Sequence, residues 1–214
     1  PTTRSLPEIA HPYYILKEAG YELVAASPKG GEAPLDQSSV EAFKDDADSK
    51  KFLNDPEAQS WVKGTLKLSE ASSELDAYKA VFYPGGHGPC FDLPVDEDSK
   101  RVIRTFYESN RPVTAVCHAP AVLTDVKLSD GSYLVKGRTV TSFTNEEEEQ
   151  AGLTKAVPWL VETRLEERGA TFQKAQPWAE KVIVDKDGDR VLITGQNPAS
   201  AAGLAKELVK VLKA

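Results

Sequence analysis

Short apolar strands that run directly into turns, and that alternate with amphipathic helices, are the feature that most constrains the fold of this chain. Residues 78–83 are rich in β-branched and aromatic side chains and end at Pro84-Gly85-Gly86, while residues 112–116 end at Cys117. Between them, residues 98–110 place apolar side chains at the i, i+3, i+4 spacing of an amphipathic helix. Strands that alternate with helices favour a mainly parallel central sheet with helices on both faces. We therefore predict a single-domain α/β fold.

The other expected elements follow from the same patterns. Residues 182–184 and 191–193 flank the turn Lys186-Asp187-Gly188-Asp189, which predicts a β-hairpin. Residues 32–75 begin with a polar, acidic stretch that has no sustained periodicity, and we expect them to form an excursion over the surface. The remaining elements are helices expected over residues 8–19, 157–168 and 199–212, and strands expected over residues 21–26, 133–135 and 139–143.

Composition argues against several classes of partner. The chain has 26 Lys+Arg against 33 Asp+Glu, a net charge of −7, so nucleic acid and anionic membrane surfaces would be repelled. No apolar run approaches the roughly 18 residues that a membrane-spanning helix needs. The two cysteines, Cys90 and Cys117, cannot form a disulfide framework, and we expect a reducing, cytoplasmic setting.

Cys117 is the candidate nucleophile. The apolar strand runs directly into it, and Ala119-Pro120 resembles the first turn of a helix, so we expect the positive end of a helix dipole to lower the pKa of the thiol. Ala115 and Ala119 are small enough for a tight nucleophile elbow, although the usual motif has glycine at both places. The alternative is that Cys117 is a small buried hydrophobic residue, as free cysteines often are.

The three histidines of the chain all lie beside features already named. His118 adjoins the cysteine, and we expect it to act as a base or orienting group. His87 lies in the glycine loop, and His11 shares a predicted helix with Glu8; for both, a structural hydrogen-bonding role remains open. No H-x-x-x-H or C-x-x-C spacing is present, so we predict no metal site.

The loop Gly85-Gly86-His87-Gly88 follows a strand and lacks the Lys-Ser/Thr of a phosphate-binding loop. We expect it to contribute to an oxyanion hole, in which the Gly86 and His118 turns direct backbone N–H groups at the same oxygen. An ordinary turn at the carboxyl end of a strand is the alternative.

The acidic run Glu146-Glu147-Glu148-Glu149 follows the strand predicted over residues 139–143. Because acidic residues are favoured in the first turn of a helix, we expect at least three of the four to be solvated. One of them is placed to reach His118 and complete a Cys-His-Glu set.

Four ordered motifs give the chain a family resemblance along nearly its whole length. It resembles the ThiJ/PfpI superfamily, and within it the branch of heat-shock chaperones and glutathione-independent glyoxalases, or glyoxalase III. The resemblance implies a flavodoxin-like three-layer α/β sandwich, related to class I glutamine amidotransferases and usually a homodimer. The motifs are Tyr83-Pro84-Gly85-Gly86-His87-Gly88, Ala115-Val116-Cys117-His118-Ala119-Pro120, Ser142-Phe143-Thr144-Asn145-Glu146-Glu147-Glu148 and Thr194-Gly195-Gln196-Asn197-Pro198-Ala199-Ser200.

The resemblance also implies site residues. The family nucleophile falls on Cys117 and its adjacent histidine on His118. The acidic member of the triad falls on Glu148, with Glu147 as the register alternative, and a second essential carboxylate falls on Glu8. Without the resemblance, Glu8 would be interpreted as an ordinary acidic residue near a helix N-terminus.

The chain departs from the family pattern in two respects. A hydrophobic strand precedes the Glu8 segment in the family, whereas this chain begins after that position, at Pro1, and contains no methionine. Loss of a central strand would leave unpaired edges inside the core, so we expect that residues of the natural protein were omitted or cleaved. Cys90 follows the glycine loop, where it is expected to be a buried structural thiol, with a redox partner as the alternative.

These observations lead to one main hypothesis and several alternatives. The resemblance implies a cofactor-independent lyase of the glyoxalase III type, which converts methylglyoxal, a small 2-oxoaldehyde, to D-lactate through a Cys117 hemithioacetal and an enediol. Glu8 would be the base and His118 the assisting group. The alternatives are a stress-associated holdase chaperone, a cysteine hydrolase (deglycase or peptidase) that uses the same residues, and a redox sensor.

Overall fold

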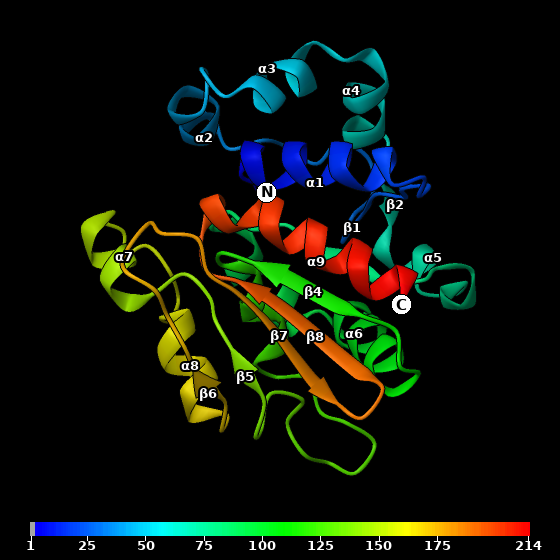
Figure 1. The fold of residues 1–214 in the computed structure, drawn as a ribbon, viewed down its shortest axis with the longest axis vertical. Helices are drawn as coiled ribbons and strands as arrows, with labels where there is room; N and C mark the ends of the chain where they lie inside the picture. Colours follow the sequence, from blue (N-terminus) through cyan, green and yellow to red (C-terminus); the bar gives the residue numbers. More distant parts are fainter. Residues whose placement is uncertain (1–2) are drawn as a thin grey trace.

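A four-stranded sheet forms the centre of the computed structural model, which describes residues 3–214 (Figure 1). The strand order is β3-β4-β8-β7, with β3, β4 and β8 parallel and β7 antiparallel to β8. Strands β7 and β8 form the predicted hairpin. The bounds are β3 (Val81–Tyr83), β4 (Val113–Val116), β7 (Val182–Asp187) and β8 (Arg190–Gly195).

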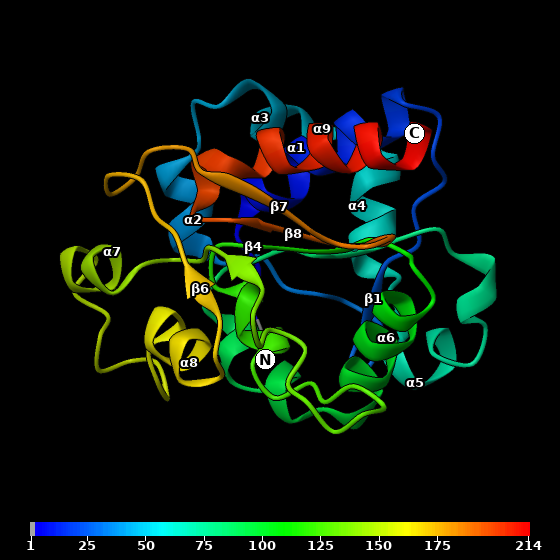
Figure 2. The ribbon, with the colours of Figure 1, turned by 60° about the horizontal axis from the view of Figure 1, so that its bottom comes forward.

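Helices cover both faces of this sheet, as Figure 2 shows. Helices α1 (Leu6–Glu18) and α9 (Ala201–Lys213) lie on one face, and α6 (Glu97–Glu108) and α8 (Val161–Glu167) lie on the other. The predicted α/β sandwich with a mainly parallel sheet is therefore confirmed. None of the helices within residues 3–214 has the length and apolar character needed to cross a membrane.

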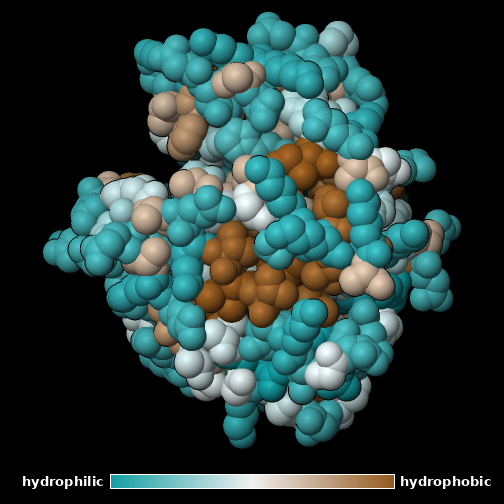
Figure 3. Space-filling model, in the orientation of Figure 1, coloured by the Kyte–Doolittle hydropathy of each residue, from teal (hydrophilic) through white to brown (hydrophobic). Residues whose placement is uncertain are grey.

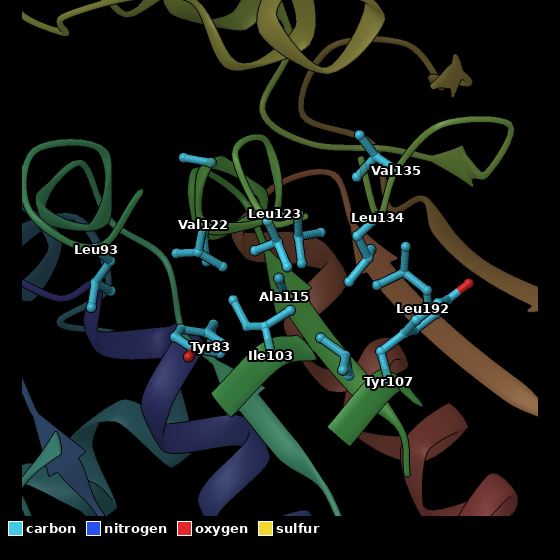
Figure 4. Packing of buried hydrophobic residues seen from close by; sticks show 14 of the residues in the cluster. Tyr83, Leu93, Ile103, Tyr107, Ala115, Val122, Leu123, Leu134, Val135 and Leu192 are labelled. Atoms are coloured by element: carbon cyan, nitrogen blue, oxygen red, sulfur yellow. The ribbon is translucent and has the colours of Figure 1, made fainter. Parts of the chain in front are cut away.

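The main core lies between the sheet and α6. Asp96 caps α6 by accepting a hydrogen bond from the Ser99 amide at 2.8 Å, which satisfies a backbone donor that the first helical turn leaves unpaired. All four residues of β4 are buried, so this strand makes apolar contacts on both of its faces. Figure 4 shows Ile103, Ala115 and Leu123 together in this cluster.

The predicted surface excursion folds into short helices, and those within residues 37–63 cover α1. Phe52 of α3 is fully buried and its ring lies edge-on to that of Tyr13, with the ring centroids 5.4 Å apart. The acidic residues Asp36, Asp46 and Asp55 cap three of these helices by accepting hydrogen bonds from backbone amides. The helices are too short to show an apolar period in the sequence. The elements are α2 (Gln37–Ala42), α3 (Ala47–Asn54), α4 (Pro56–Lys63), β2 (Leu66–Lys67) and α5 (Leu68–Ala71).

Several predicted strands are shorter than expected. Of residues 21–26, only Ala26 joins a strand, β1 (Ala26–Ser27), which pairs with β2 outside the central sheet. Of residues 139–143, only Thr139–Val140 form a strand, β5, which pairs with β6 (Thr171–Phe172). The strand predicted over residues 133–135 is wrong, because only Tyr133 forms a bridge, with Lys127. An apolar stretch becomes a strand only where a neighbouring strand satisfies its backbone groups.

Two predicted helices also differ from the structure. The helix expected over residues 157–168 begins at Val161. The segment after Cys117 is not an α-helix but a 3-10 helix, η4 (Ala119–Leu123). A further short helix, α7 (Asn145–Gln150), carries the acidic run.

The face of the molecule that carries α9 and the hairpin displays a band of apolar side chains bordered by polar surface (Figure 3).

Candidate active site

Cys117 lies on a strained turn between β4 and η4. Its backbone has a φ of 61°, in the left-handed region that residues with a Cβ rarely occupy. The Cys117 amide donates to the Gly195 carbonyl oxygen at 2.9 Å, and its carbonyl oxygen accepts from the Phe143 amide at 2.8 Å. Ala115 and Ala119 are fully buried on either side, consistent with the small side chains that a nucleophile elbow requires. Strain of this kind is characteristic of functional sites.

A chain of short hydrogen bonds connects the Cys117 thiol to Glu148. The Cys117 Sγ lies 3.2 Å from His118 Nδ1, and His118 Nε2 lies 2.6 Å from Glu148 Oε2. Burial by itself would raise the pKa of Glu148, but hydrogen bonds from His118 and His87 outweigh it and hold this pKa at about 2. The carboxylate is therefore ionised and requires a proton on His118 Nε2, which leaves Nδ1 free to accept the thiol proton.

The acidic run divides between the interior and the solvent. Glu147 is 0% exposed and Glu148 is 2% exposed, whereas Glu146 and Glu149 are exposed. The expectation that at least three of the four are solvated is therefore wrong. Thr144 caps α7 through a capping box with Glu147, which turns this end of the helix toward the protein interior.

Glu147 and Glu148 have separate sets of partners. Glu147 accepts hydrogen bonds from Asn197 Nδ2 at 2.8 Å and Gln196 Nε2 at 3.1 Å, and also from the Trp178 amide. It therefore joins the loop after β8 to the loop before β7. Glu148 is the residue that contacts His118, and the register ambiguity left by the sequence is thereby resolved.

Glu8 of α1 also interacts with the Cys117 thiol. It is fully buried, and its Oε2 accepts a hydrogen bond from the Gly85 amide at 3.1 Å. Burial raises the pKa of Glu8 from its ordinary value of 4.5 to about 7, against the lowering effect of hydrogen bonds from Ser5, Cys117 and Gly85. A Cβ on Gly85 would lie 2.5 Å from the Val116 carbonyl oxygen, so only glycine permits this close approach.

The Cys117 thiol is protonated in the resting site. Burial and the neighbouring Glu8 raise its pKa well above the ordinary value of 9, although the Gly86 and His118 amides act in the opposite direction. The expectation of a pKa lowered by a helix dipole is wrong, because the following 3-10 helix is short and desolvation dominates. The Gly86 and His118 amides are both directed at the Cys117 sulfur. Gly86 reaches this position with a φ of 93°.

The other histidines and Cys90 occupy distinct places. His87 Nε2 lies 2.8 Å from Glu148 Oε1, and its ring centroid is 3.9 Å from that of His118. His11 lies outside the site, where its Nε2 contacts Asp46 at 2.9 Å. Cys90 is 2% exposed, and burial raises its pKa to about 12. Such a thiol is chemically inert, as expected for a structural cysteine.

His87, His118 and Glu148 also have their ligand atoms within 4.8 Å of one another, which is compact enough for a metal ion. In the present arrangement, both Nε2 atoms are directed at the Glu148 oxygens. Since an N–H that donates to a carboxylate offers no lone pair, these three residues would have to rearrange before they could bind a cation.

Phe143 and Trp178 complete the site and were not identified as functional from the sequence. The Phe143 ring centroid lies 4.4 Å from that of His118 and 5.4 Å from that of Trp178. Phe143 was part of a family motif, but no feature of the sequence gave it a role. Trp178 is an isolated aromatic residue in a polar stretch of the sequence. This isolation was the one sequence signal that could have singled it out.

Comparison with known proteins places this site in a family. The model of the DJ-1/PfpI family matches residues 4–211. The chain belongs to the DJ-1/PfpI family. Among DJ-1/PfpI relatives, Glyoxalase 3 of Candida albicans is 32% identical over 212 residues, covering 94% of this chain and 86% of the relative. Glutathione-independent glyoxalase HSP31 of Saccharomyces cerevisiae is 30% identical, covering 96% of this chain and 87% of the relative.

Solved structures agree with this assignment. The crystal structure of glyoxalase III from Candida albicans superposes with a TM-score of 0.86 at 28% identity, covering 97% of this chain and 87% of that one. The flavodoxin-like architecture expected for a DJ-1/PfpI protein is therefore confirmed.

Proposed function

We propose that this protein is a glutathione-independent glyoxalase that converts methylglyoxal to D-lactate. The observation that carries the proposal is the pair formed by Glu8 and Cys117. A fully buried carboxylate with a pKa of about 7 lies beside the candidate nucleophile, and it is separate from the His118–Glu148 pair. Thiol addition needs one acid–base group, and movement of a carbon-bound proton needs a second with a pKa near neutrality.

The first step is addition of the thiol to the aldehyde. The Cys117 sulfur bonds to the aldehyde carbon, and His118 Nδ1, 3.2 Å from the sulfur, receives the thiol proton. The aldehyde oxygen becomes negative as the bond forms, and the Gly86 and His118 amides, which act on the Cys117 sulfur in the free site, would stabilise it. The proton then passes from His118 to this oxygen, which gives a neutral hemithioacetal.

The second step moves a hydrogen between adjacent carbons. The Glu8 carboxylate removes the proton from the sulfur-bearing carbon to give an enediolate, in which the hydroxyl proton on that carbon moves to the oxygen of the neighbouring carbon. The protonated Glu8 then returns its proton to the neighbouring carbon, which gives a lactoyl thioester on Cys117. Water then hydrolyses the thioester, which releases lactate and regenerates the thiol. These steps use only side chains of this chain and one water molecule, so the proposed reaction is a cofactor-independent lyase reaction.

The test is formation of D-lactate from methylglyoxal in the absence of added thiol. We expect the Cys117→Ala and Glu8→Gln variants to lose at least about a thousandfold in kcat/KM, because each removes a group that acts on the reacting atoms. Glu18→Gln is the matched control, since Glu18 is an exposed carboxylate on the same helix. Lactate production that survives Cys117→Ala would contradict the proposal.

A cysteine hydrolase is the second candidate, because Cys117, His118 and Glu148 also form the set that acyl transfer requires. Hydrolysis of an amide or ester needs no base that acts on carbon. Glu8→Gln would therefore leave a hydrolase activity intact, whereas it would abolish a glyoxalase activity. An acyl-enzyme trapped on Cys117 with a peptide or ester substrate, with activity retained in Glu8→Gln, would favour the hydrolase.

A further inference from the structure

Trp178 occupies an unusual position for a large apolar residue. Its side chain is 48% exposed, and its backbone has a φ of 65°, in the left-handed region that disfavours residues with a Cβ. It lies four residues before β7, whose first residue, Val182, pairs with Gly195. Gly195 also pairs with Val116, the residue before Cys117. Trp178 therefore lies at the same edge of the sheet as the nucleophile.

Two hydrogen bonds hold Trp178 in this conformation. Its amide donates to Glu147 Oε1 at 2.8 Å, and its indole Nε1 donates to Gln150 Oε1 at 2.7 Å. Glu147 is fully buried and also binds the Gln196 and Asn197 side chains, so the Trp178 amide is held by a buried hydrogen-bond network. With its one side-chain donor already used, the indole presents only apolar ring surface to solvent.

A row of aromatic rings connects Trp178 to the triad. The Trp178 ring lies edge-on to Phe143, with centroids 5.4 Å apart and an interplanar angle of 69°. The Phe143 ring in turn lies 4.4 Å from His118, and Phe143 is 5% exposed. An aromatic wall thus forms at the surface, where the exposed Trp178 ring is backed by the buried rings of Phe143 and His118. Folding gains little from the exposed part of this indole, whereas a ligand would bury it.

We propose that Trp178, positioned by the buried Phe143 ring, forms a subsite for the substituent of a 2-oxoaldehyde substrate, and that the subsite favours large apolar or aryl substituents. This inference rests on the proposed function. With the aldehyde carbon bonded to Cys117, a three-carbon substrate offers only a methyl group beyond the reacting carbons. A phenyl group extends further and can stack on the aromatic wall.

The test compares two substrates in two variants. Trp178→Gly removes the ring and is compatible with the positive φ, whereas Trp178→Phe keeps an aromatic ring. We expect the kcat/KM ratio of phenylglyoxal to glyoxal to fall about tenfold in Trp178→Gly, mainly through KM, and to stay within about threefold of the wild-type ratio in Trp178→Phe.

Phe91→Ala is the matched control, because Phe91 is 56% exposed and no ring contact connects it to His118 among the described residues. This variant is expected to leave the substrate ratio unchanged. An unchanged ratio in Trp178→Gly, with thermal unfolding near that of wild type, would overturn the proposal, as would a loss of selectivity in Phe91→Ala alone.

Binding of the two products separates this proposal from the proposed function. Titration calorimetry with mandelate and with lactate needs no turnover. We expect Trp178→Gly to weaken mandelate binding about tenfold while lactate binding changes by less than twofold. Selective loss of mandelate binding in a protein that forms no hydroxy acid would support the subsite and refute the glyoxalase. Equal effects on the two ligands would refute the subsite.

Discussion

Replacing Glu8 by glutamine tests whether burial raises the pKa of Glu8, and the test does not depend on the reaction that the site catalyses. Glu8 is fully buried, and its pKa is raised from 4.5 to about 7 by desolvation. A glutamine has nearly the same shape, can accept the Gly85 N–H in the same way, and never ionises. The variant is expected to be inactive but more stable than the wild type at alkaline pH.

The magnitude follows from the two pKa values. A carboxyl group whose pKa is higher in the folded state favours folding below the unfolded pKa of about 4.5 and loses this contribution as pH rises through about 7. The difference between the two pKa values corresponds to about 3 kcal/mol. We therefore expect Glu8→Gln and the wild type to be about equally stable below pH 4.5, with the variant about 3 kcal/mol more stable above pH 8.

Chemical denaturation at a series of pH values measures this difference. For a chain of this length, about 3 kcal/mol corresponds to an increase in Tm of about 6 to 12 °C. Glu18→Gln should show no such divergence, because Glu18 is exposed. A stability difference between Glu8→Gln and wild type that stays constant from pH 4.5 to 9 would refute the claim that burial raises this pKa.

The same substitution also tests how Glu8 acts on the Cys117 thiol. Because the negative charge of Glu8 raises the pKa of Cys117, removal of that charge should make the thiol more acidic. We expect iodoacetamide to modify Cys117 several-fold faster in Glu8→Gln than in wild type at pH 8. Slower modification in the variant would show that Glu8 activates the thiol in the resting site.

Three further predictions follow from the same contacts. Glu147→Gln should destabilise the protein by about 2 to 4 kcal/mol, because it disrupts a buried hydrogen-bond network. The control Glu146→Gln should change stability by less than about 0.5 kcal/mol, and urea unfolding measures both variants. Gly85→Ala should abolish activity and lower Tm, because its Cβ would lie 2.5 Å from the Val116 carbonyl oxygen; an active, stable variant would contradict the stated packing. Glu148, with its pKa held at about 2, contributes stability that is present above pH 4.5 and lost toward pH 2, so Glu148→Gln should flatten the acid limb of the stability curve.

The sequence by itself predicted the architecture and singled out Cys117 at the end of an apolar strand. Apolar residues in β4 and the amphipathic spacing in α6 are local patterns, and they indicated the sheet and its flanking helix correctly. The transition from an apolar strand to Cys117 between small residues also predicted the strained turn, since only small neighbours fit there.

Only the tertiary structure decided which of Glu147 and Glu148 contacts His118, and how the Cys117 thiol titrates. Glu147 and Glu148 are adjacent in the sequence, yet successive helical residues point about 100° apart, so one binds Asn197 and the other His118. Glu8 and Gly85 are 77 residues apart, and no local pattern encodes their contact. Burial and the charge of Glu8 set the pKa of Cys117, and both depend on elements that meet only in the folded chain.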